Sequence, residues 1–336
     1  MGLFSFTQEI AIDLGTANTV IIHNDKIVVD EPSVVALDKR TDKLLAVGEK
    51  ARLMHGKTHE NIRTIRPLRD GVIADFYAAE QMIRGMVKMV SSKSHWFSPS
   101  LRMVIGIPSG STEVEIRAVR DSSEHAGGRD VYMIYEPMAA AIGIGLDVQA
   151  PEGNMIVDIG GGTTDVAVIS LGGTVVSTSI KLAGDDFDDA IMRHVRKKHN
   201  LMIGERTAED IKIQIGTVYS SPQPKSMEVK GRDTITGLPK SVTLTSEEIK
   251  EALRDATTQI METIHSVLEK TPPELAADVA ERGIVLTGGG ALLGGLEELI
   301  EEETGINTIV ADNPAQVVAI GTGQYMEMMS KMNGKL

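Results

Sequence analysis

Two segments of this 336-residue chain repeat one pattern of residues, 145 positions apart. EIAIDLGTANTVIIH (9–23) and NMIVDIGGGTTDVAVIS (154–170) align without a gap, and each reads as two apolar strands around a short turn rich in Gly or Thr. In both copies an Asp ends the first strand, Asp13 or Asp158, and a Thr follows six residues later. This offset is too long for a solenoid repeat and suits a duplicated domain.

Both halves of the chain show the alternation of strand-like and helix-like stretches that is typical of α/β lobes. A chain of this length exceeds one ordinary core and fits two lobes of about 100–200 residues each. In the first half, LRMVIGIPS (101–109) reads as a buried strand, and Thr112 and Glu115 have the spacing of a capping box at the start of a helix. We therefore expect two closely joined α/β lobes.

The second half contains three further local signals. Thr245 and Glu248 have capping-box spacing, and Thr207 is expected to open a short helix. The Pro, Ser and Gly residues of SSPQPKSMEVKGRD (220–233) favour an exposed loop.

Composition narrows the class of protein. The chain carries 34 Lys and Arg against 47 Asp and Glu, and this acidity argues against a protein that binds nucleic acid through a basic face. It has no cysteine, so a disulfide framework and a thiolate metal site are excluded. No apolar run approaches the roughly 18 residues of a spanning helix, and the first residues lack a basic start and a cleavage site. We expect a protein that neither spans a membrane nor is secreted.

The residue types of the two hairpins suit a polyphosphate. Gly leaves room for a phosphate to approach the backbone, where successive N–H groups donate to it, and Thr hydroxyls add donors. Asp13 and Asp158 are placed to hold Mg²⁺ through its waters, because this ion takes few protein carboxylates. A duplicated structural turn is the alternative, but it leaves the repeated Asp and Thr unexplained. We expect the two hairpins to hold one nucleotide from both sides.

Two further groups are candidates for the same site. The Gly cluster from Thr287 to Ala291 follows a strand and precedes a helix, so its backbone is able to contact an adenosine or its phosphates. The alternative for this cluster is a tight structural turn. Glu136 stands before a helix that begins at Pro137, where the helix dipole keeps a carboxylate ionised and able to orient an attacking water. Its alternative role is a simple charge complement to that helix end.

Glu209 and Lys212 are three residues apart on one helical face. They are close enough to pair with each other, or to contact a ribose and an adenine ring together. A surface ion pair is the default for this spacing.

Together these motifs resemble those of bacterial actins of the MreB type, within the actin, Hsp70 and sugar-kinase superfamily. DLGTANT (13–19) resembles the first phosphate motif of that family, DIGGGTTD (158–165) the second, and TGGGALL (287–293) the adenosine motif. Asp165 departs from the pattern, because most relatives are expected to have Glu there. The resemblance runs nearly end to end and includes IPSG (107–110), EPMAAAIG (136–143), TPPELAADV (271–279) and NPAQVVAIGTG (313–323).

The resemblance implies an α/β, actin-like fold, which is a duplicated, ribonuclease H-like, two-lobed ATPase fold with four subdomains. The expected boundaries are 1–32 and 66–145 for subdomain IA, to which 312–336 returns, 33–65 for IB, 146–180 and 250–311 for IIA, and 181–249 for IIB.

The resemblance also implies roles for individual residues. Glu136 and Thr163 would position the attacking water, Asp13 and Asp158 would serve the hydrated Mg²⁺, and Glu209 and Lys212 would contact the nucleoside of ATP. The residues expected to bind ATP are Gly15, Thr16, Ala17, Asn18, Gly160, Gly161, Gly162, Thr163, Thr164, Gly184, Glu209, Lys212, Gly288, Gly289, Gly290 and Ala291.

A polymer on a membrane is the further implication. MreB-type proteins form paired protofilaments on the inner face of the cytoplasmic membrane and guide cell-wall elongation and rod shape, with MreC, MreD, RodZ and RodA as associates. Between Gln81 and Thr112 the chain has four basic residues and no acid, which favours approach to an anionic bilayer. The expected lipid contacts are Leu3, Phe4 and Phe6, on a terminus with nothing obvious to bury them, and Trp96 and Phe97, which interrupt a polar loop. For Trp96 and Phe97 the alternative is packing on their own lobe.

Three other classes of protein share parts of this pattern. A sugar or acetate kinase of the same fold needs a substrate pocket with an Asp general base, and no segment is a candidate for it. An Hsp70-like chaperone needs a peptide-binding domain after the nucleotide domain, and an FtsA-type division actin usually has a different inserted subdomain and a C-terminal amphipathic tail. The small-molecule kinase is the main alternative.

Overall fold

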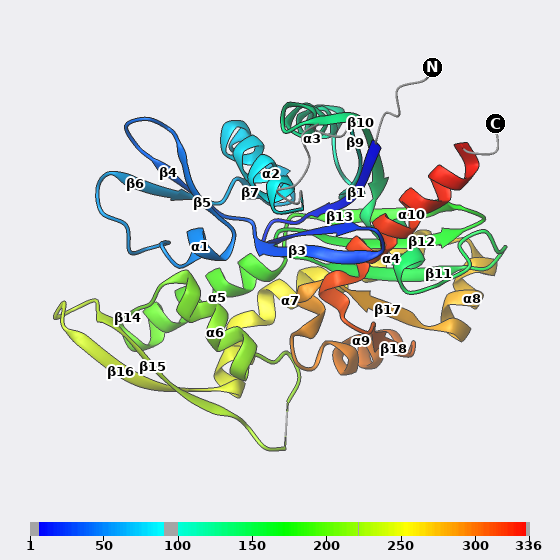
Figure 1. The fold of residues 1–336 in the computed structure, drawn as a ribbon. Helices are drawn as coiled ribbons and strands as arrows, with labels where there is room; N and C mark the ends of the chain where they lie inside the picture. Colours follow the sequence, from blue (N-terminus) through cyan, green and yellow to red (C-terminus); the bar gives the residue numbers. More distant parts are fainter. Residues whose placement is uncertain (1–6, 91–99, 221, 334–336) are drawn as a thin grey trace. The chain divides into compact units, whose positions relative to one another are not determined.

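The computed structural model describes residues 7–90, 100–220 and 222–333. The chain divides into two compact units, each with its own five-stranded sheet (Figure 1). Unit 1 comprises Met1–Ala150, Leu171–Thr174 and Ala315–Leu336, and unit 2 comprises Pro151–Ser170 and Val175–Pro314.

The main sheet of unit 1 has the strand order β10-β9-β1-β2-β3. Strands β1 and β2 are antiparallel, with Asp13 opposite Val20, whereas β1, β9 and β10 run parallel to one another. The carboxyl ends of the three parallel strands therefore lie at one edge of the sheet. The strands are β1 (Thr7–Leu14), β2 (Asn18–His23), β3 (Lys26–Pro32), β9 (Ser100–Ile107) and β10 (Gly128–Tyr135).

Helices cover both faces of this sheet. Alternate residues of β1, such as Ile10 and Ile12, join a buried cluster with Met82 and Met86 of α2. On the other face α10 packs against α4 and β1 (Figure 1), and a Cβ at Gly321 would overlap the carbonyl group of Ala139. Glycine thus permits the close approach of these two helices. The helices are α2 (Phe76–Val90), α3 (Glu113–His125), α4 (Glu136–Gly143) and α10 (Val317–Asn333).

Unit 1 also contains smaller elements between β3 and α2. A three-stranded sheet has the order β5-β4-β6, and β7 pairs with β8 in a two-stranded sheet. Their bounds are β4 (Val35–Asp38), β5 (Leu44–Val47), α1 (Glu49–Arg52), β6 (Ile62–Ile65), β7 (Leu68–Arg69) and β8 (Val72–Ile73).

The main sheet of unit 2 repeats the architecture of unit 1. Its order is β13-β12-β11-β17-β18, so three consecutive strands are again followed by two strands that run parallel to the first of them. The repeated sequence motif predicts this match, because both copies occupy the first hairpin of their sheet. The strands are β11 (Asn154–Ile159), β12 (Thr164–Ser170), β13 (Gly173–Ile180), β17 (Ile284–Thr287) and β18 (Thr308–Val310).

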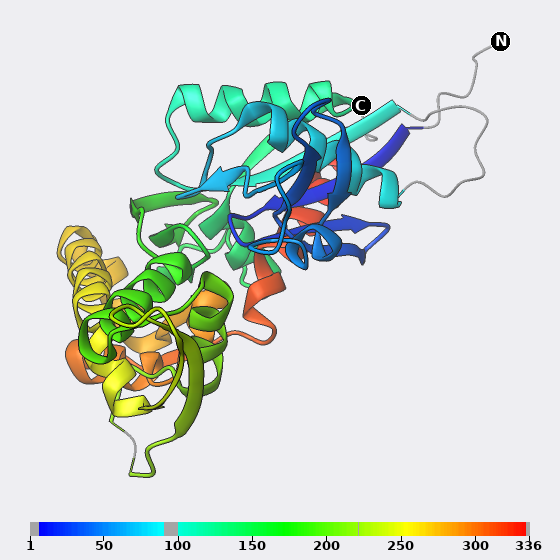
Figure 2. The same ribbon diagram turned by 90° about the vertical axis from the view of Figure 1, so that its left-hand side faces the viewer.

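The core of unit 2 lies between this sheet and its helices. Every residue of β11 and β12 is buried, and Val157 and Val166 cluster with Phe187 of α5 and Leu253 of α7. A small sheet of order β14-β15-β16 lies beside α5 and α6 in both views (Figures 1 and 2). The remaining elements are α5 (Gly184–His199), β14 (Leu201–Met202), α6 (Glu205–Ile215), β15 (Ser226–Asp233), β16 (Pro239–Thr245), α7 (Ser246–Lys270), α8 (Pro273–Arg282), η1 (Gly289–Leu292), α9 (Leu296–Thr304) and η2 (Pro314–Gln316).

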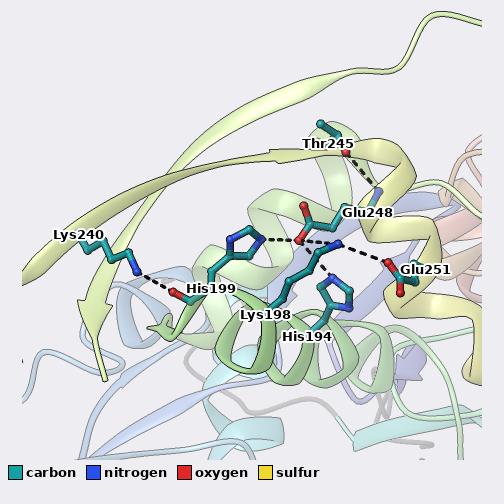
Figure 3. A network of polar contacts seen from close by, with 7 residues as sticks. All are labelled: His194, Lys198, His199, Lys240, Thr245, Glu248 and Glu251. Atoms are coloured by element: carbon teal, nitrogen blue, oxygen red, sulfur yellow. Dashed lines mark hydrogen bonds and ion pairs between the residues drawn. The ribbon is translucent and has the colours of Figure 1, made fainter. Parts of the chain in front are cut away.

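A polar network joins the end of α5 to the start of α7 (Figure 3). Glu248 Oε1 accepts hydrogen bonds from His199 Nε2 at 2.5 Å and His194 Nε2 at 3.2 Å. Lys198 lies 3.6 Å from the same oxygen and 3.5 Å from Glu251. Burial raises the pKa of Glu248, but the bonds and charges of these neighbours outweigh it and hold that pKa below its ordinary value.

Three local predictions for unit 2 need correction. Thr245 caps α7 as expected, but the Glu248 side chain binds the two histidines rather than completing a capping box. Helix α6 begins at Glu205, before Thr207, with Gly204 at its N-cap. The segment 220–233 is not all loop, because residues from Ser226 onward form β15 with Val229 buried. In unit 1 the capping box of Thr112 and Glu115 is confirmed.

Candidate functional site

The first hairpin turn of unit 1 is fixed by a side chain from the loop after β3. Ser33 Oγ donates a hydrogen bond to the carbonyl oxygen of Gly15 at 2.6 Å, and its N–H donates to that of Ala17 at 2.8 Å. The hydroxyl of Thr19 lies 2.9 Å from Ser33 Oγ and donates to it, because the Ser33 proton is already used. The turn carbonyls are thus satisfied within unit 1.

A second contact holds the same turn. The N–H of Gly71 donates to Thr16 Oγ1 at 3.1 Å, and Arg66 approaches the carbonyl oxygen of Thr16 at 3.5 Å. Residues 18 and 55 positions away from the turn therefore determine its shape. A preformed turn binds a ligand at a smaller entropic cost.

Glu136 lies at the same edge of the unit 1 sheet as Asp13. Asp13 is the penultimate residue of β1, and Glu136 directly follows β10 at the edge where β9 ends with Ile107. Glu136 opens α4 and is 9% exposed. The side chain of Glu136 lies beside Gly106 of β9, where a Cβ would be 3.5 Å from Glu136 Cγ, an ordinary packing distance. Ligands of open α/β sheets bind at such strand ends.

The second hairpin places two buried carboxylates opposite each other. Asp158 on β11 faces Asp165 on β12, and both are at most 5% exposed. Thr287 donates a hydrogen bond to Asp158 Oδ1 at 3.0 Å. Burial and the neighbouring charge of Asp165 raise the pKa of Asp158 to about 7, against the effect of the Thr287 bond. In unit 1 the residue opposite the corresponding aspartate is Val20, so this carboxylate pair belongs to unit 2 alone.

The third Gly cluster packs directly on the end of β11. Gly288 has a φ of +83°, and a Cβ there would overlap the carbonyl group of Ile159 and lie 2.7 Å from Asp158 Oδ1. At Gly290 a Cβ would lie 2.5 Å from Ile159 Cγ2. Only glycine fits at these two positions, so the loop backbone reaches the aspartate.

The start of α5 closes the other side of the second turn. The N–H of Gly184 donates to the carbonyl oxygen of Gly160 at 3.1 Å, and that of Asp185 donates to Gly161 at 2.8 Å. Lys212 of α6 extends back and donates from Nζ to the carbonyl oxygen of Gly184 at 2.9 Å. The hairpin, two helices and the Gly loop of unit 2 therefore form one connected group.

The donor set of unit 2 fits a hydrated magnesium ion. Within the described residues, no group of three or more His, Cys, Asp or Glu side chains could hold a metal on its own. Mg²⁺ is usually bound through one or two carboxylates together with waters and phosphates. Asp158 and Asp165 supply two buried, mutually repelling carboxylates, which a cation would relieve.

Most of the predicted residues fall into these two groups. Unit 1 places Asp13, the turn at 15–18 and Glu136 at one sheet edge. Unit 2 brings together Asp158, the turn at 160–164, Gly184, Lys212 and the loop at 288–291. Glu209 lies on α6, three residues before Lys212.

The expected lipid contacts Leu3, Phe4, Phe6, Trp96 and Phe97 lie outside the described residues. In the part of the chain that the structure describes, no helix has both the length and the apolar character to cross a bilayer.

Sequence reasoning missed three residues of these groups. Ser33 and Asp188 are distant in sequence from the atoms they bind, and nothing in their local pattern indicates it. Asp165 was noted only as a departure from a motif. Its place opposite Asp158 follows from the register of the antiparallel β11–β12 hairpin. The gapless repeat and the alternation of residues along the two strands contain enough information to derive that register.

The chain is similar in sequence to proteins that determine bacterial cell shape. A family model described as MreB/Mbl protein matches residues 7–334. Mbl of Bacillus subtilis (strain 168) is 49% identical over 328 residues, which cover 97% of this chain and 98% of that protein. MreB of Escherichia coli (strain K12) is 49% identical over 338 residues, which cover 98% and 96%. Both relatives are named cell shape-determining proteins.

Solved structures of related proteins support the similarity found in sequence. The crystal structure of MreB 5 of Spiroplasma citri bound to AMPPNP has a TM-score of 0.91 and 38% identity, and the match covers 98% of this chain and 99% of that one. The MamK double helical filament, at 23% identity and a TM-score of 0.81, supports the actin-like fold alone. None of these relatives is a small-molecule kinase, so that alternative has no support. With its repeated sheets and paired hairpins, the chain belongs to the MreB/Mbl family, the bacterial actins of cell shape.

Proposed function

We propose that this protein binds ATP with Mg²⁺, hydrolyses it, and assembles into filaments in the ATP-bound state. The observation that carries the proposal is the duplication of one hairpin design, with an Asp near the end of the first strand and a Gly- or Thr-rich turn in both sheets. The related MreB 5 of Spiroplasma citri was crystallised with AMPPNP and with ADP, which supports a nucleotide as the ligand.

Backbone N–H groups of both turns are the proposed phosphate donors. In unit 1 these belong to residues 15–18, and in unit 2 to residues 160–164. Gly at 160, 161 and 162 lets a phosphate approach the backbone closely. Residues 288–291, with Glu209, Lys212 and Gly184, are proposed to hold the nucleoside.

Hydrolysis requires a group that orients water, and Glu136 is the candidate. Its carboxylate is fixed at the first turn of α4, where the helix dipole favours the ionised form. Thr163 is proposed to assist in positioning the same water through its hydroxyl. Orientation of this kind contributes by holding the reacting atoms in line.

Magnesium would be held in unit 2 by Asp158, with Asp165 beside it, and Asp13 of unit 1 is proposed to serve its hydration shell. The ion would neutralise charge that develops on the phosphate oxygens. The carboxylates of this chain would orient its waters and confine it to the phosphate end of the nucleotide.

The polymer is proposed to be a paired protofilament attached to the inner face of the cytoplasmic membrane. Assembly into filaments would make such attachment stable, because one aromatic ring that inserts partly into lipid gains only about 2 kcal/mol. A filament sums many such anchors while single subunits exchange. MreC, MreD, RodZ and RodA are the proposed associates.

One experiment tests the proposal as a whole. The purified protein is incubated with anionic phosphatidylglycerol-containing liposomes and ATP, ADP or no nucleotide, and examined by electron microscopy while phosphate release is followed. We expect paired filaments on the liposomes only when ATP is present. Phosphate release should increase once the protein exceeds a critical concentration. The Asp158→Asn variant is expected to lose both.

Two controls separate the alternatives. Neutral liposomes test whether lipid charge is needed for attachment. Filaments that remain free of the anionic liposomes would contradict attachment and leave assembly intact. Glucose and acetate test the kinase, and phosphorylated product in place of concentration-dependent hydrolysis would refute the cytoskeletal function.

A further inference from the structure

The ammonium group of Lys212 is held by α5 rather than exposed on α6. Its Nζ donates to the carbonyl oxygen of Gly184 at 2.9 Å and to Asp188 Oδ2 at 2.8 Å. The side chains of Lys212 and Asp188 are only 18% and 13% exposed. This differs from the surface ion pair with Glu209 that is the default for the helical spacing.

Both members of this pair keep unused hydrogen-bonding capacity. A lysine ammonium has three N–H donors, and its contacts with Gly184 and Asp188 use two of them. Asp188 Oδ1 is buried and has no hydrogen-bond partner among the described residues. A lysine side chain has a flexible four-carbon stem, so Asp188 is the group that fixes where the third N–H points.

The charges around the pair favour a neutral ligand group over a phosphate. Burial raises the pKa of Asp188 to about 6, Lys212 opposes that effect, and the charges of Glu209 and Asp185 add to it. The positive charge of Lys212 is therefore compensated by Asp188, with two further acids near. A phosphate would meet net negative charge here, whereas a hydroxyl group would accept the N–H without that penalty.

The pair lies next to the proposed phosphate turn of the same unit. A Cβ at Gly184 would lie 3.6 Å from Lys212 Nζ and 3.5 Å from Gly161 Cα. A nucleotide with its phosphates at the second turn would have its sugar within a few bonds of this position.

We propose that Asp188 is a positioning residue that holds the Lys212 ammonium so that its third N–H donates to a sugar hydroxyl of the bound nucleotide. The pair thereby distinguishes a ribonucleotide from a deoxyribonucleotide. This inference rests on the proposed binding of ATP and ADP, and adds the group that reads the sugar.

The test compares the dissociation constants of magnesium-bound ADP, 2′-deoxy-ADP and 3′-deoxy-ADP by titration calorimetry. A hydrogen bond to a charged donor is worth enough that wild type should prefer ADP about tenfold over at least one deoxy analogue. Asp188→Asn should weaken ADP binding about tenfold and leave the binding of that analogue nearly unchanged. Asp188→Asn combined with Lys212→Met should add no further loss beyond Lys212→Met alone, because both changes remove one contact.

Asp189→Asn is the matched control, since it removes the same charge from the exposed neighbouring position of α5. Thermal unfolding of every variant monitors the fold. A purely structural role for Asp188 would weaken ADP and the deoxy analogues equally and leave their ratio intact, and that result overturns the inference. Equal affinity of wild type for all three nucleotides also overturns it. Failure of the proposed function is a different result, in which wild type binds none of them.

Discussion

Asp158 gives the most quantitative prediction, because its buried charge is costly to the fold when no cation is bound. Its pKa of about 7 stands well above the ordinary 3.8 of aspartate. A pKa raised in the folded state means that stability is fully present below about pH 4 and is lost as pH rises through about 7. At about 1.4 kcal/mol per pH unit, the loss approaches about 4 kcal/mol at pH 8.

The change Asp158→Asn removes this loss. An asparagine amide keeps an oxygen that accepts from Thr287 and presents an N–H to Asp165, so the local hydrogen bonds survive. Without nucleotide or magnesium, the variant should be more stable than wild type by up to about 4 kcal/mol at pH 8, and the two should converge near pH 4. The same variant should lose the stabilisation that Mg²⁺ with ATP gives to wild type.

Urea unfolding at intervals from pH 4 to pH 8, with and without magnesium-bound ATP, measures both effects. Asp165→Asn is a matched variant, since it removes the neighbouring charge and should give part of the same gain. Asp189→Asn changes one exposed acid and should leave the pH profile as it is. A variant at position 158 that is as unstable as wild type at pH 8, or whose gain is equal at all pH values, would show that the charge of Asp158 does not destabilise the fold.

Three other changes have defined outcomes. Glu136→Ala should slow phosphate release by about 10²–10³-fold while filaments still assemble in ATP, and normal release would remove Glu136 from the mechanism. Glu248→Gln should lower the free energy of unfolding by about 2 kcal/mol at pH 7. The lowered pKa of Glu248 provides stability that is lost as pH falls through that pKa, so the variant should lose less stability than wild type at acid pH. An unchanged dependence on pH in urea unfolding at acid pH would contradict this. Gly288→Ala should destabilise the protein by about 1–3 kcal/mol and weaken ADP binding in calorimetry, because a Cβ there overlaps Ile159 and the residue has a positive φ. Wild-type stability together with wild-type ADP affinity would show that the loop relaxes freely.

The sequence predicts the repeated parts of the molecule well, because the same pattern of strand, Asp and Gly- or Thr-rich turn occurs twice. Asp13 and Asp158, the two turns and the strand–turn start of the 288–291 loop all follow from short patterns of Gly, Thr and apolar residues. Glu136 could be placed at the start of its helix because Pro137 marks the first turn.

Contacts between distant segments could not be predicted in this way. The Ser33 and Gly71 contacts that fix the first turn depend on where loops return in space. Glu248 satisfies the spacing of a capping box, yet two histidines on α5 compete for its carboxylate and bind it. The strand at 226–233 could not be recognised from the sequence, because Pro and Ser precede it and charged residues lie on its exposed face. Val229 of this strand packs inward.

A crystal structure of this chain with an ATP analogue and magnesium tests the proposed nucleotide site directly. We expect one nucleotide per chain, with phosphate oxygens that accept hydrogen bonds from backbone N–H groups of both 15–18 and 160–164, and one magnesium ion whose waters reach Asp13 and Asp158. A nucleotide bound by only one of the two turns, or a metal remote from both aspartates, would contradict it.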